Sequence, residues 1–562
     1  MISLGADGYF RQDTDVFVPF GVNYWPTSTG TALWREWPAE EIQRDLDTVV
    51  RLGMNTVRFF LLWQDFEPEV GQFDPVCFDR LKTFVGWCAE RGILAHPTVF
   101  VGWMSGSTFF PPWKQGRNLY TDPVVRERSV LFASHVAQVL SPLQSHLLAI
   151  DIGNEIGCIG DSHRTAATDV AAWCADICAV LKAACPGILV ISGLDSTPIH
   201  ANSGWRLTDQ PGCDLYSAHG YPVPNWNVVR FDGMTDPLAQ AILPTYTRLL
   251  RAYGPTFAQE FGTIATGGAA EQEAYLRGLL PALWEAGANG FLWWCLKDMS
   301  ETAPPYDQVP FECRLGLVDE SGNIKPGLGY LLEFGRDLAT RSPMSTSGNR
   351  TVGIYIPRQY YFGGAGEPNY GNSPAKLAPR FLIADYLLRR AGYNTCFVRG
   401  EATAQNRLES VDALLVAGAA LPPAEVSYLA EWVQNGGKLL WHGVDISRWG
   451  PTVTRLLGAN MADLRTGRPV SADVFGENWE FTAGPEETWV VPEVTTATVL
   501  ARDGEHATPV IWRHPFGRGC VVSTVLPVED SILAVAQNRA ARDRWAQWYD
   551  GALRAMTTTD SP

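Results

Sequence analysis

Several features are scarce or missing in this chain of 562 residues, and each absence excludes a class of protein. Charged residues make up only 19% of the chain, and acidic residues outnumber basic ones, so the formal net charge is -16. This balance argues against nucleic acid or an anionic membrane surface as a partner. No apolar run is long enough to cross a bilayer, and no basic segment followed by an apolar one opens the chain. We therefore expect a cytoplasmic protein with no membrane partner.

The eleven cysteines include no Cys-x-x-Cys pair, the spacing typical of many zinc and redox sites. Their number is odd, and most lie in apolar segments. We predict buried, reduced thiols rather than disulfides or zinc ligands. The sequence also holds no phosphate loop and no nucleotide-binding fingerprint, so we expect neither a cofactor nor a metal.

What the chain does contain is enough apolar sequence, 46%, to build more than one large core. Residues 1–340 alternate strand-like and helix-like segments, which predicts a (β/α)8 barrel. The predicted strands are 16–22, 55–60, 93–99, 149–155, 188–192, 214–218, 256–262 and 290–295. The predicted helices are 40–52, 75–91, 124–140, 165–185, 238–253 and 270–286.

A second domain is predicted after a linker at 341–350, which is rich in Ser, Pro and Gly. Within 351–562 the strands 351–356, 411–416 and 438–441 alternate with the helices 376–391 and 423–435. This order is typical of a smaller α/β domain with a parallel sheet. The region 466–528 is rich in β-branched residues and turns, and 533–556 predicts one amphipathic helix.

Two of the barrel strands end in a glutamate. The stretch at 149–155 reads Ala-Ile-Asp-Ile-Gly-Asn-Glu and ends in Asn154 and Glu155, and the stretch at 256–262 contains Glu260. A single glutamate at a strand end is more often a salt-bridge partner or a helix cap. In this architecture, however, active residues come from the C-terminal ends of strands. Two carboxyl groups about 5 Å apart are what a retaining glycosidase needs, one to protonate the leaving oxygen and one to attack the anomeric carbon.

Other polar residues fall at corresponding strand ends. Arg58 lies inside the apolar stretch Thr-Val-Arg-Phe-Phe, where an unpaired guanidinium would be costly, so we expect it to meet Glu260. The other residues of this kind are His96, His219, Tyr221 and Trp294. Each of them alone could be an ordinary core side chain, but several at separate strand ends favour a site.

The motifs Thr-Val-Arg58, Gly-Asn154-Glu155, His219-x-Tyr221, Gln-Glu260-Phe-Gly and Gly290-x-x-x-Trp294 resemble glycoside hydrolase family 5 and its clan of (β/α)8 retaining enzymes. The resemblance covers residues 15–300 in order and spacing. It implies that Glu155 is the acid/base and Glu260 the nucleophile. It further implies that Asn154 bonds the substrate 2-hydroxyl, that Arg58 and Tyr221 position the nucleophile, that His96 and His219 line the subsite, and that Trp294 forms its floor.

Thirteen of the 21 tryptophans precede residue 341, several of them in predicted loops. Flat aromatic faces stack on pyranose rings, although a tryptophan is also an ordinary core residue. We predict Trp25, Trp103 and Trp205 as sugar contacts.

In the second domain, Val411-Asp-Ala-Leu-Leu-Val-Ala-Gly418 and Gly436-Gly437-Lys-Leu-Leu resemble the amidotransferase-like domain that follows the barrel in family 42 β-galactosidases. A true amidotransferase needs a cysteine nucleophile, but the strand end here reads Ala417-Gly418-Ala419-Ala420. We therefore expect a non-catalytic, flavodoxin-like domain. In the resembling enzymes this domain builds a trimer, so we expect a homo-oligomer.

These observations favour a retaining exo-β-glycosidase that acts on short oligosaccharides. Family 5 members of this compact intracellular kind include β-mannosidases, so the resemblance implies a β-mannosidase, with mannose-β-1,4-N-acetylglucosamine as a candidate substrate. A β-glucosidase, a β-galactosidase, an endo-acting mannanase or glucanase, and a non-catalytic carbohydrate-binding protein remain alternatives, because loop geometry decides between sugar epimers.

Overall fold

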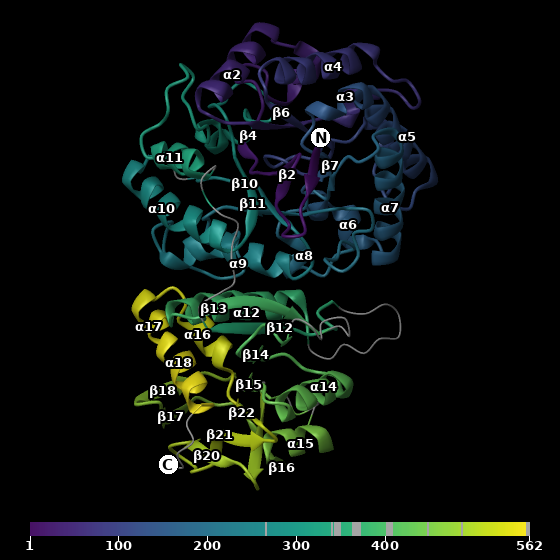
Figure 1. Ribbon diagram of the computed structural model, residues 1–562. Coiled ribbons are helices and arrows are strands. Elements are labelled where there is room, and N and C mark those ends of the chain that lie inside the picture. Colours follow the sequence, from purple (N-terminus) through teal and green to yellow (C-terminus); the bar gives the residue numbers. More distant parts are fainter. Residues whose placement is uncertain are drawn as a thin grey trace. The chain divides into compact units, whose positions relative to one another are not determined.

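The computed structural model describes residues 1–264, 267–338, 341, 350–361, 372–400, 408–444, 446, 449–484 and 487–557 (Figure 1). The chain divides into two units. One comprises Met1–Val223 with Gly233–Ser345, and the other comprises Pro224–Asp232 with Thr346–Pro562. The short segment 224–232, which the sequence assigns to the barrel, thus groups with the C-terminal unit. Residues 342–349 of the predicted linker lie outside the described residues.

The first unit is a (β/α)8 barrel. Its eight-stranded sheet has the order β8-β7-β6-β5-β4-β11-β10-β9, and every pairing within it is parallel. A parallel bridge between Ile191 and Leu215 joins the two ends of that order and closes the barrel. The strands are β4 (Phe20–Asn23), β5 (Thr56–Phe60), β6 (Leu94–Val101), β7 (Ile150–Asn154), β8 (Val190–Ile191), β9 (Tyr216–Gly220), β10 (Thr256–Phe261) and β11 (Ala288–Trp293).

Helices surround this sheet close to the predicted positions (Figure 1). They are α2 (Ala39–Arg51), α4 (Pro75–Glu90), α5 (Pro123–Leu140), α7 (Ala167–Ala184), α9 (Pro237–Arg251) and α10 (Ala269–Glu285). Three of them begin with Asp followed by Pro, and the caps Asp74, Asp122 and Asp236 accept hydrogen bonds from the first free backbone N–H groups. Proline suits the first helical position because its missing N–H would have no partner there.

The first predicted strand, 16–22, is wrong as a single element. Pro19 interrupts it, because proline lacks the N–H that a sheet ladder uses. Residues before it form β3 (Asp15–Phe17), which pairs with β2 (Phe10–Gln12). β2 also pairs with β1 (Ile2–Leu4), so the three strands make a small antiparallel sheet. Residues after it form the barrel strand β4.

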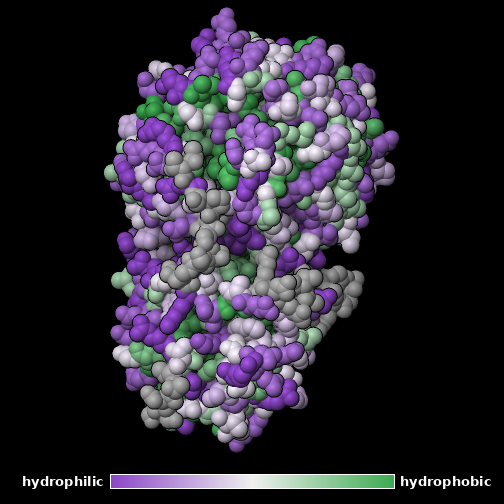
Figure 2. Space-filling model, viewed as in Figure 1, coloured by the Kyte–Doolittle hydropathy of each residue, from purple (hydrophilic) through white to green (hydrophobic). Residues whose placement is uncertain are grey.

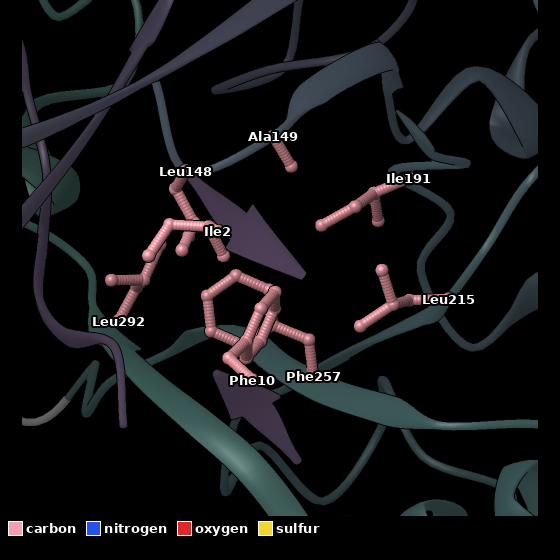
Figure 3. Packing of buried hydrophobic residues seen from close by; sticks show 8 residues of the cluster. All are labelled: Ile2, Phe10, Leu148, Ala149, Ile191, Leu215, Phe257 and Leu292. Atoms are coloured by element: carbon pink, nitrogen blue, oxygen red, sulfur yellow. The ribbon is translucent and has the colours of Figure 1, made fainter. Parts of the chain in front are cut away.

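This N-terminal sheet contributes to the barrel's hydrophobic core. Ile2 and Phe10 pack with Ala149 and Phe257, which lie at the starts of barrel strands (Figure 3). The cluster also contains Leu148, Ile191, Leu215 and Leu292. Leu148, Ala149, Leu215 and Phe257 lie at or just before the N-terminal ends of their strands.

The second unit contains a seven-stranded sheet of order β13-β12-β14-β15-β22-β21-β20. The pairings from β13 to β22 are parallel, as predicted, whereas β21 and β20 are added antiparallel. Its strands are β12 (Thr351–Ile356), β13 (Asn394–Arg399), β14 (Ala413–Ala417), β15 (Lys438–His442), β20 (Thr498–Arg502), β21 (Pro509–Phe516) and β22 (Gly519–Thr524), with helices α12 (Pro374–Arg390) and α14 (Pro423–Gln434).

The predicted helix 533–556 is instead three helices, α16 (Val528–Ala534), α17 (Arg539–Arg544) and α18 (Ala546–Ala555). Asn538 interrupts the run by capping α17 with its side chain, which accepts from the Ala541 N–H.

The surface is largely polar on the face shown in Figure 2, with apolar residues scattered among polar ones. Among the described helices, none combines the length and the apolarity that crossing a membrane requires.

Candidate active site

The barrel register brings the predicted polar residues to one level. Arg58 on β5 is the Cα partner of Asn23 on β4 and of His96 on β6, and Glu260 on β10 is the partner of His219 on β9. The register of β10 shifts between Ala258 and Glu260. Such an irregularity lets the consecutive side chains of Gln259 and Glu260 both contact interior residues, which a regular strand would not allow.

The two glutamates predicted from the sequence face each other. Carboxylate oxygens of Glu155 and Glu260 and a ring nitrogen of His219 all lie within 4.8 Å of one another. The Glu155 side chain is 18% exposed and that of Glu260 is 7% exposed. Both carboxylates can therefore be reached from solvent, and neither has turned to the outer face of the barrel.

Glu155 owes its position to an unusual backbone. It follows β7 in the left-handed region, with φ at 46°, and its N–H donates to the Gly193 carbonyl at 2.8 Å. Gly193 has φ at +65°, and a Cβ there would lie 1.5 Å from the Gly153 oxygen. Only glycine permits this close approach of the loop after β8 to the end of β7.

Arg58 is fully buried and bonds to several residues of the site. The predicted ion pair with Glu260 is present, with a distance of 3.2 Å between Nη1 and Oε2. Its Nη2 donates to Asp151 at 2.7 Å and to Asn154 Oδ1 at 2.8 Å. Asp151 was not predicted, although a carboxylate inside an apolar strand needs a partner for the same reason as Arg58 does. Further bonds from the guanidinium reach Thr98 and Asn23.

Glu260 has a second donor, because the Tyr221 hydroxyl donates to its Oε1 at 2.8 Å. Asn154 donates from Nδ2 to the Trp103 carbonyl at 2.7 Å, and a primary amide carries a second hydrogen that a substrate hydroxyl can accept.

The two carboxyl groups differ in their electrostatic surroundings. Burial raises the pKa of Glu155 well above its ordinary value, and the negative charges of Asp195 and Glu312 act in the same direction while Arg58 opposes them. Burial also raises the pKa of Glu260, whereas the charge of Arg58 and the hydrogen bond from Tyr221 lower it. The donors around Glu260 thus do not fully offset its burial, and the larger rise falls on Glu155.

A chain of hydrogen bonds runs from Glu155 into the barrel. His219 Nδ1 lies 2.9 Å from Glu155 Oε1, and its Nε2 lies 3.1 Å from Gln259 Oε1. Gln259 Nε2 in turn lies 2.8 Å from His96 Nε2. His96 is completely buried, so the expectation that it lines the sugar subsite is wrong. It contacts the site only through Gln259, a residue that the sequence analysis did not single out.

The predicted tryptophans divide by burial. Trp25 stacks on Phe60 and Trp205 packs edge-on against Trp173, and both are completely buried. Because a sugar needs an accessible ring face, the prediction that these two contact substrate is wrong. Trp103 is 39% exposed, and Trp294 follows β11 next to Phe60 with 3% of its surface exposed.

Two further acidic residues lie near Glu155 and were not predicted. Asp195 follows β8, and Glu312 lies in the short 3-10 helix Pro310–Arg314 with its Oε2 accepting from Ser105 at 2.5 Å. Asp195 lies in a loop and Glu312 in a single short 3-10 helix, and neither segment is long enough for a periodic pattern to indicate a functional side chain.

Among the described residues, two groups have the composition and spacing of metal ligands. One is Glu155, His219 and Glu260, where the neighbouring Arg58 guanidinium opposes a bound cation. The other is the thiol group of Cys174, Cys178 and Cys213, which lies apart from this site on α7 and the loop before β9.

The chain is similar to known proteins in both sequence and fold. The family described as Cellulase (glycosyl hydrolase family 5) matches residues 18–300. Exo-beta-1,4-mannosidase Op5Man5 from Opitutaceae bacterium strain TAV5 is 39% identical over 98% of this chain and 99% of its own, with a TM-score of 0.93. A GH5_18 protein from Streptomyces cattleya in complex with Manb1-4GlcNAc is 21% identical over 71% of this chain and 98% of its own, with a TM-score of 0.59.

Two β-galactosidases are also similar. That of Rahnella sp. R3 matches 96% of this chain and 88% of its own at 14% identity and a TM-score of 0.69, a likeness of fold that includes the second unit. The Beta-galactosidase of Xanthomonas manihotis is 29% identical over 124 residues, and that match spans only 20% of either chain.

The family match covers half of the chain and includes every barrel strand that carries the site. The match to Op5Man5 extends the likeness over almost the whole length at 39% identity. The chain therefore belongs to glycosyl hydrolase family 5 and is a retaining glycoside hydrolase.

Proposed function

We propose that this enzyme is an exo-β-mannosidase in which Glu155 is the acid/base and Glu260 the nucleophile. The observation that carries the proposal is the pair of facing carboxylates, with oxygens within 4.8 Å of one another at the ends of β7 and β10. Retaining glycosidases hold their two carboxyl groups about 5–5.5 Å apart, because the nucleophile must reach the anomeric carbon directly.

In the first step, a Glu260 oxygen attacks the anomeric carbon and forms a glycosyl ester. The bond to the leaving oxygen breaks, and that oxygen takes the proton of Glu155. The raised pKa of Glu155 suits this role, since the group must still hold its proton near neutral pH.

In the second step, Glu155 accepts a proton from a water molecule, whose oxygen attacks the anomeric carbon and releases Glu260. Arg58 and Tyr221 each donate to one oxygen of Glu260, so they hold the carboxylate in a fixed orientation through both steps. Asn154 is proposed to bond the 2-hydroxyl, Trp294 to lie beneath the sugar ring, and Trp103 to contact sugar at its exposed face.

The choice of mannose and of exo action is supported by the likeness to Op5Man5, which spans nearly all of both chains at 39% identity. A β-galactosidase is the second candidate, supported by the 29% identity over 124 residues to the Xanthomonas manihotis enzyme. We favour the mannosidase because the match to Op5Man5 has the higher sequence identity and covers about five times as much of this chain.

The test is a panel of nitrophenyl β-D-glycosides together with mannose-β-1,4-N-acetylglucosamine and longer β-mannans. We expect the β-mannoside to be hydrolysed with the highest kcat/KM and one mannose to be released per cleavage from the chain end. A galactoside or glucoside as the best substrate would overturn the choice of sugar, and release of internal oligosaccharides from β-mannan would overturn exo action.

The residue roles are tested by Glu260→Ala and by NMR of the first anomer. We expect β-mannose as the first product and activity reduced to background in the variant. Initial release of the α anomer, or unchanged activity in Glu260→Ala, would contradict the assignment.

We also propose that the second unit serves assembly into a homo-oligomer, a trimer as in the family 42 enzymes that it resembles. Its β14 ends at Ala417 and is followed by Gly418, Ala419 and Ala420, so no thiol lies where an amidotransferase nucleophile would be. Light scattering should give a mass close to three times 61.8 kDa, and a clean monomer would contradict the proposal.

A cytoplasmic location is proposed from the thiols. The chain has eleven cysteines, an odd number with no Cys-x-x-Cys pair, and most of them are buried. This pattern is typical of proteins from a reducing compartment. Recovery of the activity mainly from the medium or the cell envelope would contradict this location.

A further inference from the structure

The hydrogen-bond chain behind Glu155 contains enough fixed donors and acceptors to determine where each proton lies. It begins with the Gln259 amide, which is completely buried. One amide atom lies 3.1 Å from Asp151 Oδ2, and that carboxylate is paired with Arg58 and can only accept. The atom facing it must therefore be the Nε2 donor, which leaves Oε1 facing His219.

His96 supports the same orientation independently. Its Nδ1 lies 3.0 Å from the Ala149 carbonyl oxygen, which can only accept, so Nδ1 carries the hydrogen. Burial lowers the pKa of His96 to about 4, so the ring is neutral and Nε2 holds a lone pair. That lone pair accepts from Gln259 Nε2 at 2.8 Å.

The tautomer of His219 follows. Its Nε2 faces the Gln259 carbonyl oxygen at 3.1 Å and must donate to it. Burial lowers the pKa of His219, so the neutral ring presents the Nδ1 lone pair to Glu155 Oε1 at 2.9 Å. If Glu155 were ionised, a lone pair of its Oε1 would face the lone pair of His219 Nδ1, and the two would repel each other. A protonated Glu155 instead donates a hydrogen bond to Nδ1.

We propose that Gln259 is a positioning residue that fixes the tautomer of His219 and so keeps the acid proton on Glu155 in the resting enzyme. The inference rests on the proposed role of Glu155. After Glu155 has given its proton to the leaving oxygen, the same lone pair disfavours its anion, which promotes return of a proton from water in the second step. Besides His219, the charged and titratable groups around Glu155 are Arg58, Asp195, Glu312, Glu260, Tyr221 and Cys158.

The test is Gln259→Met, which keeps the side-chain length and removes the carbonyl acceptor. His219 can then move its hydrogen to Nδ1 and donate to an ionised Glu155. We expect the basic limb of kcat/KM to move to lower pH for a substrate with a poor leaving group. Activity on the alkaline side should fall by up to the ~10²-fold that a general acid contributes. A dinitrophenyl glycoside, whose leaving group needs no proton, should lose much less.

Gln272→Met is the matched control. Gln272 is also buried, in α10, and donates to Thr263 at 2.8 Å rather than to a member of the hydrogen-bond chain, so the pH profile of the variant should equal that of the wild type. If the wild type is active and its activity depends on Glu155, but the basic limb of its kcat/KM profile is the same in Gln259→Met, the inference is overturned. The proposed function would then remain intact. Absence of glycosidase activity in the wild type would instead overturn the proposed function.

A measurement on the wild type needs no variant. In protein with ¹⁵N-labelled histidine, two-bond proton–nitrogen spectra distinguish protonated from unprotonated ring nitrogens. We expect an unprotonated Nδ1 and a protonated Nε2 in His219 near neutral pH. The opposite tautomer, or a ring with both nitrogens protonated, would refute the assignment.

A second inference rests on the thiol group of Cys174, Cys178 and Cys213. Cys174 and Cys178 lie one turn apart on α7, and the Cys213 sulfur lies 3.8 Å from one and 3.9 Å from the other. Four thiolates around zinc at ~2.3 Å are separated by about 3.8 Å along the edges of a tetrahedron. The Gly212 backbone permits this arrangement, because a Cβ there would lie 2.5 Å from the Cys178 Cβ.

We infer that these three sulfurs form a binding site for one thiophilic divalent cation such as Zn²⁺, with water as the fourth ligand at the half-buried Cys213 side. The bound ion would join α7 to the loop that leads into β9, the strand that carries His219. Metal binding replaces three S–H protons by three metal–sulfur bonds and needs no oxidant.

Titration of the reduced full chain with Co²⁺ tests the site. We expect one equivalent to produce a thiolate-to-cobalt charge-transfer band, which Zn²⁺ then displaces. Cys213→Ser should lose the band, whereas Cys88→Ser, a completely buried cysteine in α4, should keep it. No band in the wild type, or a band that persists in Cys213→Ser, would overturn the site.

Discussion

Replacement of Arg58 by methionine is the most informative single change in the barrel. The guanidinium is completely buried and donates to Asp151, Glu260 and Asn154. Methionine fills much of the same volume but leaves two buried carboxylates without their cation. Asp151 would keep its hydrogen bonds from Thr98 and Gln259. Glu260 would keep its hydrogen bond from Tyr221.

Removal of one partner from a buried ion pair typically costs about 3–5 kcal/mol, because the remaining charge stays desolvated. With 1.36 kcal/mol for each factor of ten, the unfolding equilibrium should shift by roughly 150- to 5,000-fold. The cost should depend on pH. The pKa of Glu260 is raised above its ordinary value even with Arg58 present, so its ionisation opposes folding as the pH rises through the folded-state pKa. Loss of Arg58 enlarges that opposition, so the destabilisation should be greater at pH 8 than at pH 5.

The assay is urea unfolding at both pH values, followed by tryptophan fluorescence, with the barrel transition identified as the one that the variant moves. Arg277→Met is the control, because Arg277 forms an exposed ion pair with Glu273 on α10 of the same unit, and the loss of such a pair has little effect on stability. Equal destabilisation by the two variants would refute the reasoning. A large cost that is identical at pH 5 and pH 8 would show that lost packing, rather than uncompensated charge, is responsible.

Three further predictions follow from the site and the core. Glu155→Ala should lose ~10²- to 10⁴-fold in kcat/KM on substrates with poor leaving groups, and azide should restore turnover of an activated aryl glycoside as a glycosyl azide of retained configuration; no rescue would contradict the acid/base role. Asp195→Asn removes a negative charge that raises the pKa of Glu155, so the basic limb of the pH–rate profile should move to lower pH. A shift to higher pH would contradict this direction. Phe10→Ala should destabilise the barrel by about 3–5 kcal/mol through a cavity among Phe257 and its neighbours, while kcat of the folded enzyme is unchanged; a loss below 1 kcal/mol in thermal unfolding would show that the N-terminal sheet is not part of the core.

The sequence by itself determined the barrel, because strand-like and helix-like segments alternate along residues 1–340 and the pattern of apolar residues shows which segment is which. Asp-Pro pairs fixed the starts of α4, α5 and α9 within a residue or two. It also predicted that Glu155, Glu260 and Arg58 lie close together, since a charged side chain at the end of, or inside, an apolar strand needs a partner. The ion pair between Arg58 and Glu260 could be predicted on that ground alone.

Only the tertiary structure decided which of the aromatic and polar side chains are buried and which are exposed. Trp25, Trp103 and Trp205 all lie in loop-like sequence. Trp25 is buried against Phe60 and Trp205 against Trp173, whereas Trp103 is exposed. The link from His96 through Gln259 to His219 depends on a register shift in β10, and the charges of Asp195 and Glu312 come from loops far apart in the chain. Burial and distance between segments are properties of the folded barrel, and no local pattern of residues encodes them.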